Sequence, residues 1–282
     1  PLLFACNSRG GKSKKEKVTA PQPATESVFD NNDYHTLSNA GEVFGKHLAL
    51  DIEVDFKQKQ IRGTASWDIE KRKTEADKFI LDTRDLKIDS VQYEDGSKAA
   101  FESGETDSIL GTPLSISLKP ETKKVKIFYR TTPKATALQW LDPAQTFGKK
   151  QPFLYTQSES IHARTWIPVQ DGPGVRYTYT AKVKVPKGLM ALMSAENPQA
   201  LSEDGVYDFK MDMPVPAYLM ALAVGDIKFQ AIDQRTGVYA EPVMLAKAHK
   251  EFEEVGAMVH KAEELYGPYR WGRYDILVLP SG

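Results

Sequence analysis

Two polar side chains spaced two residues apart, Gln157 and Glu159, are the first candidates for chemistry in this sequence. They lie in "YTQSESIHARTWIPVQDGPG" (155–174), which also holds a histidine, an arginine and an aspartate. On an extended backbone, side chains two residues apart point to the same side. A carboxylate beside an amide offers acceptors to a cation that donates several hydrogen bonds, such as a free amino terminus. Composition alone favours the alternative, a polar strand end or a loop in which Glu159 pairs with Arg164.

Other routes to catalysis lack the residues they need. A zinc-hydrolase helix would show His-Glu-x-x-His, because residues four apart share one helix face, and none of the five histidines forms this motif. His249 and His260 would stand roughly 16 Å apart along a helix, too far to share one zinc ion. No G-x-S-x-G occurs, and the single cysteine has no histidine close in sequence. We therefore predict no catalytic residue and no metal ligand in this chain alone.

The composition is that of a folded protein without a strong charge bias. Lys and Arg total 37 against 38 Asp and Glu, so no global field attracts nucleic acid. Hydrophobic residues make up 41% of the 282 residues, which is enough to bury a substantial core. No run approaches the roughly 18 apolar residues of a membrane-spanning helix.

The start of the chain resembles a processed bacterial lipoprotein. "LFAC" (3–6) matches a lipobox that ends at Cys6, the only cysteine, and a polar stretch follows it. We expect residues 1–5 to be a signal-peptide remnant, Cys6 to carry lipid, and residues 6–30 to be a tether. This hypothesis places the protein in the bacterial cell envelope, facing the periplasm or the cell surface, with a lipid anchor as its membrane contact. The alternative is a buried structural cysteine near a frayed terminus.

Period-two alternation dominates the chain from residue 47 onward. In "HLALDIEVDFKQ" (47–58) the residues Leu48, Leu50, Ile52, Val54 and Phe56 share one face and three acids share the other. Such a division is typical of a sheet with one solvated face. Further strands are predicted at 61–70, 78–83, 86–94, 114–118, 124–130, 177–186, 189–195, 205–213 and 217–232. Short strands at near-regular spacing predict a mainly β sandwich or curved sheet.

The pattern changes near residue 235. Residues 243–265 keep a helical period, and "YDILVLP" (274–280) is predicted as a short strand with no partner to cover it. A helix followed by such a strand indicates the opening of a second domain.

A family resemblance changes the weight given to the polar stretch. Gln157, Glu159, Arg164, Pro168, Asp171 and Pro173 follow the Q-x-E…R…P-x-x-D-x-P block of the M1 (gluzincin) zinc aminopeptidases. Further pieces are similar in the same order, among them "KHLALDIEVDFKQKQIRGTASWDI", "MPVPAYLMALAVGD" and "YGPYRWGRYDILVLP". The segment "TPKATALQWLDPAQTFGKKQPF" resembles the leukotriene A(4) hydrolase branch most closely.

The resemblance implies a fold and a mechanism. It implies a saddle-shaped β-sandwich N-terminal domain (31–234), followed by the first helix and strand of a truncated thermolysin-like α+β catalytic domain (235–282). The intact enzyme would use zinc to activate water and would remove the N-terminal residue of peptides. The zinc-binding motif would come later than residue 282, so this chain alone is expected to bind no zinc and to be inactive. Its missing catalytic domain would be a partner.

The resemblance also assigns roles to residues. Glu159 would grip the α-ammonium group of a peptide substrate with a free N-terminus, and Gln157 would contact the first substrate residue. Arg164, Asp171 and Pro173 would be scaffold that supports the loop. Leukotriene A(4) hydrolases usually carry Gln where this chain has Glu159, which favours peptide cleavage over epoxide hydrolysis. Two alternatives stay open: an epoxide hydrolase of that branch, and a non-catalytic surface lipoprotein whose β domain binds a peptide or another partner.

Overall fold

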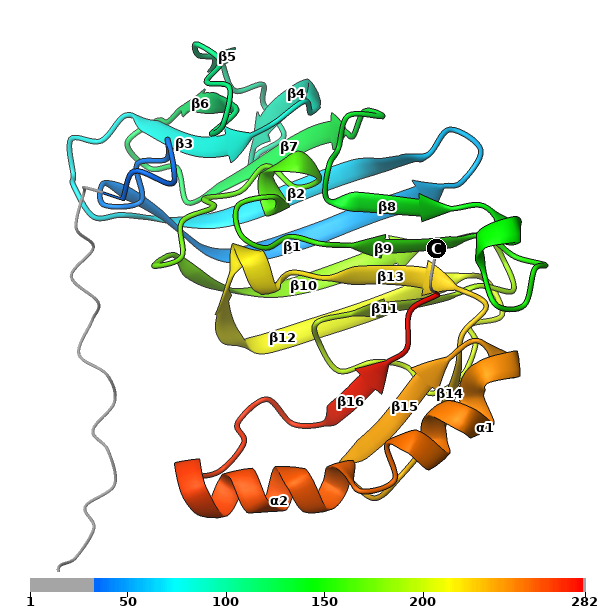
Figure 1. Cartoon of the computed structure of the whole chain (residues 1–282). Helices are drawn as coiled ribbons and strands as arrows, with labels where there is room; N and C mark the ends of the chain where they lie inside the picture. Colours follow the sequence, from blue (N-terminus) through cyan, green and yellow to red (C-terminus); the bar gives the residue numbers. More distant parts are fainter. Residues whose placement is uncertain (1–32, 281–282) are drawn as a thin grey trace, which may run out of the picture.

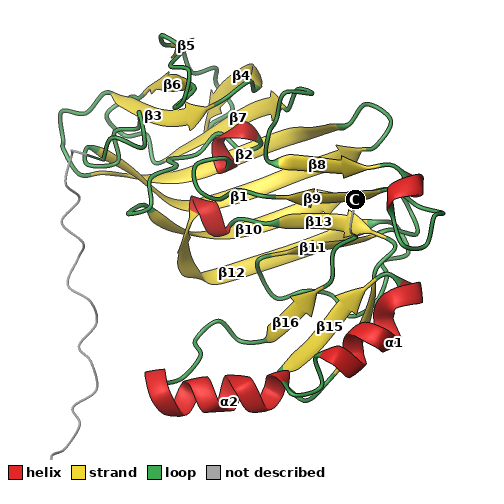
Figure 2. Cartoon of the chain, viewed as in Figure 1, coloured by secondary structure: helices red, strands yellow, loops and turns green. Residues whose placement is uncertain are grey.

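The computed structural model describes residues 33–280, and strands make up most of it. Figure 1 shows a large sheet behind a smaller one, with the two helices below them near the end of the chain. Figure 2 shows the same preponderance of strands over helices. One continuous hydrophobic core holds buried residues from both of these sheets. The prediction of a mainly β fold is confirmed.

The largest sheet has six strands in the order β12-β10-β1-β2-β7-β4. These strands are β1 (Val43–Asp55), β2 (Gln60–Lys71), β4 (Lys87–Tyr93), β7 (Lys124–Arg130), β10 (Arg176–Lys184) and β12 (Val206–Pro216). On β1, Leu48, Leu50, Ile52 and Val54 are buried, as the alternation predicts. On its other face, Glu53 lies 2.9 Å from Arg62 and 3.5 Å from Lys184. The acidic face of β1 is therefore a solvated ion-pair face.

The second sheet has four strands in the order β11-β13-β9-β8. They are β8 (Leu138–Leu141), β9 (Phe153–Thr156), β11 (Met190–Met193) and β13 (Leu222–Gly225). The prediction of one strand over 217–232 is wrong. That stretch forms the 3-10 turn η3 (Ala217–Leu219), then β13, then β14 (Lys228–Ala231), with a turn in which Ile227 N–H donates to the Gly225 carbonyl at 3.0 Å. The chain must turn there because β13 and β14 pair into different sheets.

A small third sheet has the order β3-β6-β5. Its strands are β3 (Lys78–Thr83), β5 (Phe101–Ser103) and β6 (Thr112–Ser117). Near the C-terminal end of β3, backbone hydrogen bonds join Asp82 and Val169 in both directions, at 2.7 and 3.2 Å. This bridge brings the small sheet against the polar stretch of residues 155–174.

The last part of the chain forms a separate three-stranded sheet with two helices. The sheet has the order β14-β15-β16, where β15 is Thr236–Ala240 and β16 is Tyr274–Leu277. β16 was expected to lack a partner, and this expectation is wrong, because β16 pairs in parallel with β15. The pairing went unpredicted because the sequence analysis assigned no strand to 236–240. The domain boundary predicted at residue 234 falls between β14 and β15, and these two strands pair with each other. The boundary itself stays a prediction.

The single helix predicted over 243–265 is two helices, α1 (Pro242–Glu251) and α2 (Val255–Tyr266). The break brings the first turn of α2 against the turn between β14 and β15. A β carbon at Gly256 would lie 2.0 Å from the Asp233 carboxylate, so any larger residue there would displace that side chain. Neither helix of residues 33–280 has the length and apolar character needed to cross a membrane.

Candidate functional site

The loop that follows β9 carries Gln157 and Glu159. Both side chains are exposed, whereas Ser158 between them is buried at 3% exposure. Among residues 33–280, no side-chain hydrogen bond or ion pair involves the Glu159 carboxylate. The peptide bond between Glu159 and Ser160 is cis. The two candidate residues are therefore an exposed amide and an exposed carboxylate that has no side-chain partner among the described residues.

Backbone and side-chain contacts hold this loop at the end of the four-stranded sheet. Gln157 N–H donates to the Ala137 carbonyl at 2.9 Å, and Ala137 N–H donates to the Thr165 hydroxyl at 3.1 Å. The Ser158 hydroxyl donates to the Met220 carbonyl at 2.7 Å and accepts from the Trp166 indole N–H at 3.1 Å. The loop is thus attached to β8, to η3 and to the turn η2 (Ala163–Thr165).

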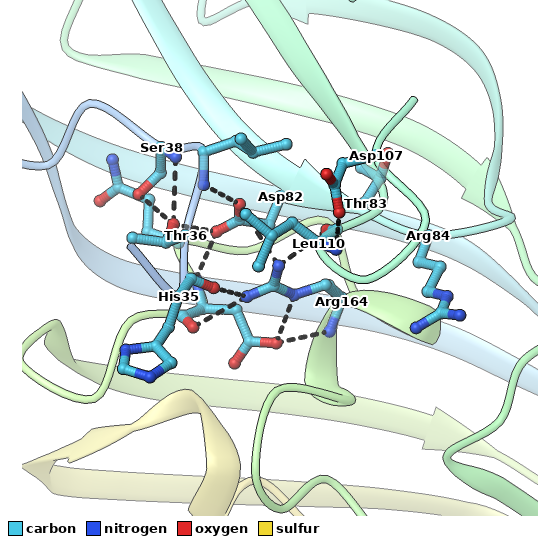
Figure 3. Close-up of polar contacts among 12 residues, drawn as sticks. His35, Thr36, Ser38, Asp82, Thr83, Arg84, Asp107, Leu110 and Arg164 are labelled. Carbon is cyan, nitrogen blue, oxygen red and sulfur yellow. Dashed lines mark hydrogen bonds and ion pairs between the residues drawn. The ribbon is translucent and has the colours of Figure 1, made fainter. Parts of the chain in front are cut away.

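Arg164 does not pair with Glu159; it lies in a buried cluster (Figure 3). Its Nε donates to Asp171 Oδ2 at 3.0 Å, and both side chains are at most 2% exposed. Its terminal nitrogens donate to the carbonyls of Leu110 and His35, each at 2.7 Å. These contacts join the start of the described chain, the loop before β6 and the polar stretch. Arg164 and Asp171, which the resemblance assigns to the scaffold, form a buried ion pair with each other, whereas their support of a function at Glu159 stays a prediction.

A second carboxylate, Asp82, belongs to the same cluster and was missed by the sequence analysis. It lies 3.8 Å from Arg164 and accepts hydrogen bonds from Leu37 N–H at 2.7 Å, Asp171 N–H at 2.8 Å and the Thr36 hydroxyl. Burial raises the pKa of Asp171 to about 6, although Arg164 favours the charged form. Burial also raises the pKa of Asp82. Asp82 sits in an ordinary strand pattern, "KFILDT", so no local signal marked it.

Gln170, at an unspecified position of the motif, and Pro168 make structural contacts. Gln170 is buried; it accepts from Gly45 N–H at 3.0 Å and donates to the Val43 carbonyl at 2.9 Å, which ties the stretch to β1. The Pro168 carbonyl accepts from the buried Trp67 indole at 3.0 Å. Pro173 is exposed within a turn that Val175 N–H closes onto the Gly172 carbonyl at 3.0 Å.

Comparison with known proteins identifies the family of the chain. Residues 33–219 match the peptidase M1 N-terminal domain. The chain belongs to the M1 peptidase family. The Xenopus laevis leukotriene A-4 hydrolase is 41% identical over 245 residues, covering 83% of this chain and 40% of that protein. The Yarrowia lipolytica leucine aminopeptidase 2 is 38% identical over 264 residues, covering 92% of this chain and 40% of that protein.

Solved M1 structures share the fold. The native yeast leukotriene A4 hydrolase matches with a TM-score of 0.83 at 36% identity, covering 90% of this chain and 40% of that one. An M1 zinc metallopeptidase from Deinococcus radiodurans matches with a TM-score of 0.68 at 19% identity, covering 86% of this chain and 57% of that one, a likeness of fold alone. This M1 chain thus spans about 40% of the length of its curated relatives. The predicted family and fold are confirmed.

A further buried carboxylate of this M1 chain, Glu241, joins the C-terminal sheet and helices to the four-stranded sheet. It lies directly before α1 and is 2% exposed. Its two oxygens accept from Phe147 N–H at 2.8 Å and Gly148 N–H at 3.0 Å, in the loop between β8 and β9. β9 leads from that loop to Gln157. The sequence analysis missed Glu241 because its partners lie more than ninety residues away.

His249 and His260, the two histidines on the helices of this M1 chain, contact different partners. His249 Nε2 lies 3.1 Å from the Ala231 carbonyl, and His260 lies 3.4 Å from Glu264 on the exposed face of α2. Within residues 33–280, no three His, Cys, Asp or Glu side chains gather closely enough to hold a metal ion. The described residues therefore do not fit the zinc ion that the family implies. Cys6, the predicted lipidation site, lies outside the described residues.

Proposed function

We propose that this chain is the N-terminal portion of a zinc-dependent aminopeptidase and contributes the recognition of the substrate's α-ammonium group. The observation that carries the proposal is the exposed Glu159 carboxylate, which has no side-chain partner among residues 33–280 and stands beside Gln157. Arg164, the partner that the sequence offered for this carboxylate, is engaged with Asp171 and backbone carbonyls instead. A carboxylate in this state can accept hydrogen bonds from an incoming ammonium group.

The contribution of these residues is to bind and orient the substrate. The Glu159 carboxylate would pair with the charged amino terminus, and the Gln157 amide would contact the first residue. Fixing the amino terminus fixes the peptide bond that follows it, so a single residue would be removed. An acetylated terminus carries no charge and would be rejected. In the complete enzyme, zinc would supply the activation of the hydrolytic water.

The names of the relatives include an aminopeptidase and a leukotriene A-4 hydrolase, so they support peptide cleavage without excluding the second activity. A yeast relative has been solved with bestatin. The charge at Glu159 favours the aminopeptidase, because an epoxide offers no ammonium group for the carboxylate to bind. The gene sequence distinguishes a non-catalytic binding domain from the enzyme. A stop directly after the codon for Gly282 would support the binding domain, whereas downstream G-x-M-E-N and His-Glu-x-x-His motifs would support the enzyme.

The proposal is tested by a substitution in the complete gene product. Glu159→Gln should raise KM for an aminoacyl-coumarin substrate at least tenfold, equivalent to about 1.4 kcal/mol, since it removes the charge that pairs with the ammonium group. Glu105→Gln removes an equally exposed charge in the loop between β5 and β6 and should leave KM unchanged. An unchanged KM in Glu159→Gln would overturn the proposal.

We further propose that Cys6 carries lipid and holds the protein in the bacterial cell envelope. The support is the "LFAC" pattern and the polar stretch after it. Palmitate fed to cells that express the complete gene should label the protein, and Cys6→Ser should abolish the label. Equal labelling of the variant would overturn this proposal.

A further inference from the structure

We propose that Ser158 is a positioning residue, whose buried hydroxyl sets the direction in which Gln157 and Glu159 point. This inference rests on the proposed function of Glu159. Ser158 lies between the two exposed side chains, and its hydroxyl donates to the Met220 carbonyl at 2.7 Å. The same oxygen accepts from the Trp166 indole N–H at 3.1 Å. One hydroxyl thus makes two hydrogen bonds to two separate segments.

The loop has few other restraints at this point. β9 ends at Thr156, so the ladder of backbone hydrogen bonds no longer fixes the residues after it. Two backbone contacts remain: Gln157 N–H to the Ala137 carbonyl at 2.9 Å, and His162 N–H to the Ser158 carbonyl at 2.8 Å. The Ser158 hydroxyl therefore supplies two side-chain contacts at the point where Gln157 and Glu159 leave the sheet.

Both partners of Ser158 are themselves fixed. Met220 is 1% exposed, and its N–H closes the η3 turn onto the Ala217 carbonyl at 2.9 Å. Trp166 is fully buried, and its backbone N–H closes the η2 turn onto the Ala163 carbonyl at 3.0 Å. Arg164, the middle residue of η2, belongs to the buried ion-pair cluster. Ser158 thus fixes the backbone between two exposed side chains to buried residues. A loop that is already ordered loses less conformational entropy when the substrate binds.

The same contacts would also exist if Ser158 were merely structural, so the test must separate binding from folding. Ser158→Ala removes both hydrogen bonds and leaves a buried N–H and a buried carbonyl unpaired. In the complete enzyme we expect KM for an aminoacyl-coumarin to rise about five- to tenfold with kcat changed less than about twofold, because the ammonium contact is misplaced while the reacting groups stay. Unchanged KM would overturn the inference.

A matched control exists on the same sheet. The Ser194 hydroxyl accepts from Ala221 N–H at 3.2 Å and lies 3.0 Å from the Tyr179 hydroxyl, just after β11 ends. It likewise makes two hydrogen bonds at that end of the sheet, but it lies outside the loop of Glu159. Ser194→Ala should leave KM unchanged. An equal rise in KM for Ser194→Ala would show a general structural effect and would overturn the inference.

A double variant tests whether Ser158 acts through Glu159. Ser158→Ala combined with Glu159→Gln should give the KM of Glu159→Gln alone, because a misplaced carboxylate cannot matter once its charge is gone. Any rise beyond Glu159→Gln alone should be small and come from Gln157; full multiplication of the two effects would overturn the inference while leaving the proposed function intact. If Glu159→Gln by itself leaves KM unchanged, the proposed function fails and the inference fails with it.

Trp166→Phe provides a second route if Ser158→Ala does not fold. It removes the indole N–H and keeps the hydrogen bond from Ser158 to Met220. We expect a smaller rise in KM, about two- to threefold, with kcat unchanged. A folded Trp166→Phe enzyme with wild-type KM would overturn the inference even without the first variant.

Discussion

The guanidinium Nε of Arg164 lies 3.0 Å from the Asp171 carboxylate, with Arg164 at 0% and Asp171 at 2% side-chain exposure. The same guanidinium reaches the carbonyls of Leu110 and His35. It therefore joins three segments that are far apart in sequence. The pair fixes the segment that follows the Glu159 loop, and it leaves the Glu159 carboxylate itself without a cationic partner among the described residues.

Removing the guanidinium should destabilise the fold strongly. Arg164→Met leaves the buried carboxylates of Asp82 and Asp171 without their cation, and losing one partner of a buried pair costs about 3–5 kcal/mol. Urea unfolding of this chain measures the change in the free energy of unfolding. Arg62→Met is the control, because Arg62 pairs with Glu53 on an exposed strand face and such pairs contribute at most about 1 kcal/mol. Equal losses in the two variants would contradict the assignment of the buried cluster as structural.

The same cluster should make stability depend on pH with a sign opposite to that of most carboxylates. The pKa of Asp171 is raised from 3.8 to about 6 in the folded protein. Its stabilising contribution is therefore fully present below about pH 4 and is lost as the pH rises through about 6. The loss should approach about 3 kcal/mol, from roughly two pKa units at 1.36 kcal/mol each.

Asp171→Asn isolates that dependence, because the amide keeps an acceptor and cannot titrate. The free energy of unfolding of the wild type, measured relative to that of Asp171→Asn, should fall as the pH rises from 4 to 7. Taking this difference cancels the pH-dependent contributions that both proteins share. Glu53 makes one such contribution, because the hydrogen bond from Arg62 lowers its pKa. A difference that stays flat over this range would refute the raised pKa.

Glu241 should hold the loop between β8 and β9 against the start of α1. Glu241→Gln replaces one acceptor oxygen by an NH₂ group that faces a backbone N–H, so at least one buried hydrogen bond is lost, at about 1–3 kcal/mol. Amide exchange at Phe147 and Gly148 should accelerate at least tenfold. Glu253→Gln alters an exposed ion pair with Lys250 and serves as the control. Unchanged exchange at both amides would contradict this role.

Zinc should neither bind to nor stabilise this chain by itself. Within residues 33–280 no cluster of potential ligands exists, and the ligands that the family implies are expected from sequence after residue 282. Dialysis against zinc followed by metal analysis should show no stoichiometric ion, and a chelator should leave the melting temperature unchanged, because a ligand stabilises only the state it binds. An aminoacyl-coumarin assay of the chain should show no turnover. One tightly held zinc per chain would refute this expectation.

Local patterns predicted the elements whose stability is local in origin. The alternation of β1 was readable because one face of its sheet is buried and the other is solvated, so each residue type reports its own side. The strand assigned to 217–232 was wrong because alternation cannot show which sheet each half joins. The helix over 243–265 was predicted as one because its periodicity continues through the break, while the close approach of Gly256 to Asp233 depends on a distant turn.

The candidate site divides in the same way. The sequence by itself determined the family and the mainly β fold, and it singled out Gln157 and Glu159 as candidates, because motif order and two-residue spacing are properties of the chain. Only the tertiary structure decided that Arg164 pairs with Asp171 rather than Glu159, and that Asp82, Ser158 and Glu241 are buried polar residues of consequence. The physical reason is that a buried polar group is satisfied by whichever partner the fold brings within hydrogen-bonding distance, and here those partners lie up to 129 residues away.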